Sequence, residues 1–103
     1  MRLSEKRHLF RRMKRLLIGY GELIGYNVVE DQGKRCDDCP NTHPQSAHKA
    51  GLAIDLILYD EHWNYLTDGS HYGKLHDFWD YIGGSQRINH DLNHFSLEHQ
   101  GVR

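Results

Sequence analysis

Apolar residues near the start of the chain are spaced three and four positions apart, with charged residues between them. This spacing is typical of an amphipathic helix and predicts one from Ser4 to about Gly25, where a glycine suits the helix end. The same spacing later in the chain predicts a second helix that ends at Gly83 and Gly84. The apolar positions are Leu9, Phe10, Met13, Leu16, Leu17 and Tyr20 in the first helix, and Tyr72, Leu75, Phe78, Trp79 and Ile82 in the second.

Short runs of β-branched and other apolar residues predict the strands. Residues 26–30 predict a first strand, and residues 52–59 are a nearly continuous apolar run that predicts a central one. A turn at 60–62 leads into a further predicted strand at 63–66, and residues 93–98 predict the last strand. Residues 31–44 are predicted to be a loop, because they combine Gly, Pro, Asn and charges without periodicity. Strands that follow one another without regular helical crossovers favour an α+β fold with a small, mainly antiparallel sheet.

The length of 103 residues predicts a single domain over residues 1–103. The formal net charge of −1 is unevenly distributed, because residues 1–15 hold seven Lys or Arg and one acid, Glu5, which leaves −7 on the remainder. We expect the basic segment to be a solvated helix face, with attachment to an anionic surface as the alternative. No basic repeat is interleaved with aromatic residues, so nucleic acid is not an expected partner. No stretch approaches the ~18 apolar residues of a membrane span, and no apolar signal core follows the basic start.

Asp55 lies inside the apolar run of the predicted central strand. A buried carboxylate has to be paired, neutralised or bound to a metal ion. His48 precedes it by seven residues, and a turn through Gly51 can bring the imidazole beside the carboxylate. His94, at the start of the last predicted strand, offers a third ligand, and three protein ligands with an open position are typical of catalytic zinc. Asp91, three residues before His94, is placed to act as general base and acid.

Each of these residues also has an ordinary structural explanation. His48 and Asp55 alone could form a buried hydrogen bond, and Asp91 alone could be a turn residue. Glu98 is a second candidate base, but four strand residues from His94 correspond to about 13 Å, which is too far for a shared water. We therefore interpret Glu98 as structural.

The two cysteines form the sequence CDDC at Cys36 and Cys39. Together with His43 and His48 they have the spacing of a small structural zinc site, which would leave Asp55 and His94 unexplained. A disulfide or two free thiols are the other interpretations. We expect the remaining histidines at the surface or behind the site, namely His43, His62, His71, His76, His90 and His99.

Two motifs in order are more specific than either one alone. The string S-x-H-x-x-G-x-A-x-D is matched by Ser46, His48, Gly51, Ala53 and Asp55, and D-x-x-H follows at Asp91 and His94. These motifs resemble zinc peptidases that include D-Ala-D-Ala carboxypeptidases and phage L-alanyl-D-glutamate endolysins. The resemblance is closest to compact phage and prophage members, and it extends to residues 1–6, 66–68 and 93–99, whereas residues 31–45 diverge.

The resemblance implies a Hedgehog/DD-peptidase-like zinc peptidase fold with one zinc ion per chain. It implies His48, Asp55 and His94 as ligands, Asp91 as general base and acid, and Ser46 as a hydroxyl that supports the ligands or orients the substrate. The family also has a substrate-binding Arg after its first strand. The corresponding residue is Arg35, whose neighbours depart from the family pattern.

The function implied by the resemblance is hydrolysis of peptide bonds in bacterial peptidoglycan stem peptides, by an L-Ala-D-Glu endopeptidase or a D-Ala-D-Ala carboxypeptidase. The first alternative is a catalytically inactive zinc-containing module for cell-wall binding or assembly. The second is a nucleic-acid binder that uses the basic helix and a Cys/His zinc knuckle, against which the charge of −7 on the remainder of the chain argues. We expect a monomer located in the cytoplasm of a phage-infected or prophage-carrying bacterium, which acts on the wall after release.

Overall fold

The computed structural model describes residues 1–31, 51–89 and 91–98. Along the chain these residues form α1 (Leu3–Leu23), β1 (Asn27–Asp31), β2 (Ala53–Tyr59), α2 (Gly69–Tyr81) and β3 (His94–Ser96). The three strands make one sheet in the order β1-β2-β3, and both pairings are antiparallel. The prediction of an α+β fold with two helices and a small antiparallel sheet is confirmed.

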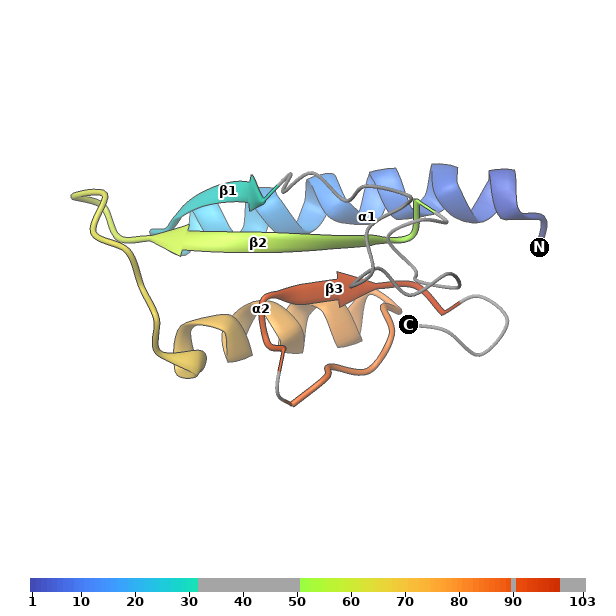
Figure 1. The fold of residues 1–103 in the computed structure, drawn as a ribbon. Coiled ribbons are helices and arrows are strands. Elements are labelled where there is room, and N and C mark those ends of the chain that lie inside the picture. Colours follow the sequence, from blue (N-terminus) through green and yellow to red (C-terminus); the bar gives the residue numbers. More distant parts are fainter. Residues whose placement is uncertain (32–50, 90, 99–103) are drawn as a thin grey trace, which may run out of the picture.

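Both helices lie on one face of the sheet (Figure 1). Alternate residues of β2 point to this face, and Ile54, Leu56 and Leu58 are buried there. The core joins these strand residues to α1, α2 and β3, and its fully buried members include Leu17, Leu75, Trp79 and Phe95. The other face of β2 carries Ala53, Asp55, Ile57 and Tyr59, so Asp55 lies on the side away from the helices.

Both helices end close to their predicted limits, and their ends have identifiable local causes. α1 ends at Leu23, and Gly25 adopts a φ of 107°, which a residue with a side chain rarely adopts. α2 begins at Gly69, because the Asp68 carboxylate accepts a hydrogen bond from the backbone N–H of Ser70 at 2.9 Å. Of the seven basic residues at 1–15, five are exposed, and Lys14 pairs with Glu30 of β1 at 2.9 Å.

The prediction of a strand at 63–66 is wrong. Only an isolated bridge between Tyr59 and Tyr65 is formed there. The Asp60 side chain accepts hydrogen bonds from the backbone N–H groups of His62 and Asn64, at 2.8 and 2.9 Å, and so closes a compact turn. Trp63 in this turn has a φ of 64°, which is incompatible with a strand. The last strand is also shorter than residues 93–98, since β3 covers three residues.

Candidate metal centre

The register of the sheet brings Asp55 and His94 together. Asp55 of β2 pairs with His94 of β3 across one edge and with Asp31 of β1 across the other. Directly opposed residues of antiparallel strands have side chains on the same face. A row of two carboxylates and one imidazole therefore crosses the sheet on the face away from the helices.

The turn before β3 adds a third side chain to this pair. The backbone N–H of His94 donates to the carbonyl of Asp91 at 3.1 Å, and that of Asp91 donates to the carbonyl of Ile88 at 2.9 Å. The end of the turn is joined to β2, because the N–H of Leu56 donates to the carbonyl of Asn93 at 2.9 Å. As a result, one donor atom from each of Asp55, Asp91 and His94 lies within 4.8 Å of the others.

The distances and burial suit a bound cation. His94 Nδ1 lies 3.4 Å from Asp55 Oδ1, and both residues are 7% exposed. Two ligands of a tetrahedral ion at ~2.0–2.1 Å lie ~3.3–3.4 Å apart, so the two atoms are already spaced as neighbouring ligands would be. Asp91 is less buried than the other two and closes the group toward solvent. Two carboxylates and one imidazole could hold a metal ion here.

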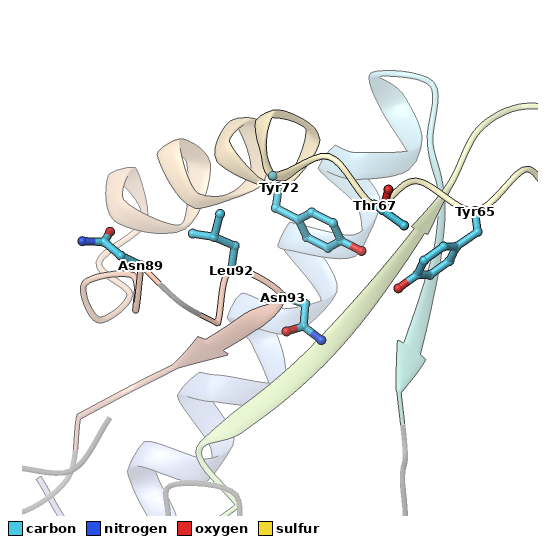
Figure 2. A pocket seen from close by; sticks show the side chains of 7 residues that line it. Tyr65, Thr67, Tyr72, Asn89, Leu92 and Asn93 are labelled. Atoms are coloured by element: carbon cyan, nitrogen blue, oxygen red, sulfur yellow. The ribbon is translucent and has the colours of Figure 1, made fainter.

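An open pocket of about 390 Å³ adjoins the turn that carries Asp91 and His94 (Figure 2). Asn89, Leu92 and Asn93 form one wall, and the segment leading into α2 forms the other with Tyr65 and Thr67. Tyr72 at its base belongs to the core, and its hydroxyl accepts a hydrogen bond from the N–H of Leu58 at 3.3 Å. Burial raises the pKa of Tyr72, so the phenol stays neutral. The pocket lining offers amide and hydroxyl groups without a charged side chain.

The predicted site residues divide into two groups. Asp55, Asp91 and His94 are brought together, with one donor atom of each within 4.8 Å of the others. The other predicted residues lie outside the described part of the chain, namely Arg35, Ser46 and His48, as do Cys36, Cys39 and His43 of the alternative zinc site. Glu98 is exposed and is not a member of the group around Asp55.

His76 is one of the histidines that the sequence predicts at the surface or behind the site. The structure places it in the core, where its side chain is fully buried behind the turn. Burial lowers its pKa, so the ring is neutral near pH 7. The position of His76 three residues before Trp79 on the buried face of α2 is a signal that could have suggested a core histidine. The residue elsewhere in the chain with which His76 forms a hydrogen bond could not be inferred from that position.

The fold and site together define a small α+β domain with a candidate metal centre on the face of its sheet away from the helices. Comparisons of the chain with protein-family models, with characterised proteins and with solved structures find no match. Among the described residues, neither helix combines the length and the apolar character that crossing a membrane requires.

Proposed function

We propose that this protein is a zinc-dependent peptidase that hydrolyses peptide bonds in bacterial peptidoglycan stem peptides. The observation that carries the proposal is the convergence of Asp55, Asp91 and His94 within 4.8 Å on one face of the sheet. These are three of the residues that the two sequence motifs contribute. Oxygen and imidazole donors at this spacing suit zinc.

Each of the three side chains has a distinct role in this reaction. Asp55 and His94 hold the metal ion from adjacent strands, with His48 as the third ligand expected from the sequence. A divalent ion held there would supply Lewis-acid chemistry, polarising the scissile carbonyl and making water easier to deprotonate. Asp91, the most exposed of the three, takes the proton from the attacking water and returns it to the leaving amine.

The neighbouring pocket is suited to a peptide. Its uncharged polar side chains, Thr67, Asn89 and Asn93, can donate to and accept from backbone amides without requiring a charged partner. The pocket is lined by Asn89, Leu92 and Asn93, so a stem peptide lying in it would contact the turn that carries Asp91.

The test combines zinc analysis with mass spectrometry of muropeptides released from purified peptidoglycan. Asp91→Asn preserves the size of the side chain and removes the base, so we expect zinc content to stay near one per chain while cleavage falls by about 10²–10⁴-fold. Glu98→Gln is the matched control, because it makes the same chemical change in an exposed acid outside the group. We expect it to cleave like the wild type.

The new terminus in the released fragments identifies the bond that is cut. Full cleavage by Asp91→Asn would remove Asp91 from its role. Zinc without cleavage in the wild type would favour the inactive wall-binding or assembly module, and absence of bound zinc would contradict the whole proposal.

A further inference from the structure

His76 of α2 contacts the turn that carries Asp91 and His94. Its Nε2 atom lies 2.6 Å from the carbonyl oxygen of Leu92, which is the residue directly after Asp91. A carbonyl oxygen can only accept, so Nε2 must carry the proton and donate. The side chain is fully buried, and solvent therefore does not compete for this hydrogen bond.

The same ring also supports the residue that follows His94. It stacks on Phe95, with ring centroids 4.2 Å apart and planes inclined by 16°. Phe95 is 1% exposed and packs edge-on against Trp79, which lies on α2 like His76. His76 thus contacts the chain on both sides of His94, at Leu92 by a hydrogen bond and at Phe95 by stacking.

Packing alone does not account for a histidine in this position. Its Nδ1 atom is buried and has no hydrogen-bond partner in the described part of the chain. A buried acceptor without a partner costs free energy that an apolar side chain of similar size would avoid. The hydrogen bond from Nε2 to Leu92 is the contact that an apolar replacement would lose.

We propose that His76 is a positioning residue, which holds the turn from Asp91 to His94 in the conformation that directs both side chains toward Asp55. Donors held in place before the ion arrives bind it more tightly, because less ordering is required on binding. The part of this inference that concerns metal binding rests on the proposed function. The part that concerns the turn does not, because the contacts of His76 with Leu92 and Phe95 involve protein atoms alone.

Three variants separate positioning from general stability. His76→Leu removes the donor, and His76→Gln keeps an N–H donor at the place of Nε2. Leu75→Ala is the control for lost core packing, because Leu75 is equally buried on the same helix but packs toward Gly21 of α1. Zinc dissociation constants are measured by competition with a chelator. We expect a 10- to 100-fold weaker affinity for His76→Leu, substantial recovery in His76→Gln, and no more than a threefold change in Leu75→Ala.

Amide hydrogen exchange in the metal-free variants tests the turn itself. The His94 amide, which donates to Asp91, is compared with the Leu97 amide, which donates to the carbonyl of Leu52. In His76→Leu we expect exchange at His94 to accelerate at least tenfold more than at Leu97, whereas Leu75→Ala should accelerate both equally. Equal acceleration in His76→Leu, or unchanged zinc affinity, would overturn the proposal.

A measurement on the wild type keeps the proposal testable if His76→Leu does not fold. Long-range ¹⁵N–¹H correlation spectra report which ring nitrogen of His76 carries the proton, and we expect Nε2. Protonation at Nδ1 alone would overturn the inference. Wild-type protein that binds zinc without cleaving peptidoglycan would contradict the proposed function, and the affinity and exchange comparisons would still decide the role of His76.

Discussion

Zinc binding should stabilise the folded protein through the group around Asp55, and the perturbation that tests this is Asp55→Asn. The substitution keeps the size of the side chain and removes its charge. Asp55 contacts both other members of the group, because it pairs with His94 across the sheet and lies in the same 4.8 Å group as Asp91. We therefore expect Asp55→Asn to lose most of the stabilisation by zinc.

The magnitude follows from linkage between binding and folding. At a free zinc concentration of about 1,000 times the dissociation constant, an ion that binds only the folded state adds about 4.1 kcal/mol to the free energy of unfolding. A chain of 103 residues unfolds with an entropy of about 2.1 cal/mol/K per residue. One kcal/mol then corresponds to about 4.6 °C, and saturating zinc should raise the wild-type Tm by about 19 °C.

The assay is calorimetry or thermal-shift measurement in zinc-buffered solution, with a control that separates this group from incidental surface binding. His62 Nε2 lies 3.4 Å from Glu61 Oε1, the same spacing as the pair of His94 and Asp55, but both side chains are at least 77% exposed. Glu61→Gln should therefore keep the full shift. An equal rise in Tm for the wild type and Asp55→Asn, or loss of the shift in Glu61→Gln, would refute the reasoning.

Three further predictions concern the core behind the site. Trp79→Phe should lower the free energy of unfolding by about 2 kcal/mol, because the fully buried indole fills the core and donates to the carbonyl of Ser96 at 3.0 Å. Urea unfolding measures this free energy, and a change below about 0.5 kcal/mol would contradict the packing. Gly84→Ala should lower the free energy of unfolding by about 1–3 kcal/mol, because a Cβ there would overlap the indole of Trp79. Unchanged stability in the same assay would contradict this prediction and show that the indole moves aside readily. Burial lowers the pKa of His76 below its usual value of 6.5, so the unfolded chain binds the proton more readily than the folded protein. The free energy of unfolding should therefore fall as the pH drops from about 6.5 through the folded pKa. Urea unfolding between pH 7.5 and 5 should show this fall in the wild type and not in His76→Leu, and an identical pH dependence of the two proteins would contradict the prediction.

Local patterns in the sequence were sufficient to predict the helices and the central strand. The spacing of apolar residues located α1 and α2, because a helix with one buried face repeats every 3.6 residues. The apolar run at 52–59 located β2 and showed that Asp55 occupies a position where a carboxylate needs a partner. The motifs at Asp55 and at Asp91 to His94 then selected three residues that the fold does bring together.

Where local chemistry competed with the pattern, the sequence prediction was wrong. Residues 63–66 have the composition of a strand, but the Asp60 side chain satisfies the backbone of the turn and Trp63 adopts a positive φ. Side-chain to backbone hydrogen bonds of this kind offer the chain an alternative to strand pairing. The pattern of apolar residues contains no information about this competition.

The sequence by itself determined which segments bury an apolar face and which residues carry metal-binding chemistry, because both depend on residue type and local spacing. Only the tertiary structure decided that Asp55 lies directly opposite His94, since strand register depends on pairing between segments far apart in the chain. It also decided that the ring of His76 reaches Leu92 and Phe95. Such contacts follow from how α2 packs against the sheet, and no periodicity within a single segment specifies that packing.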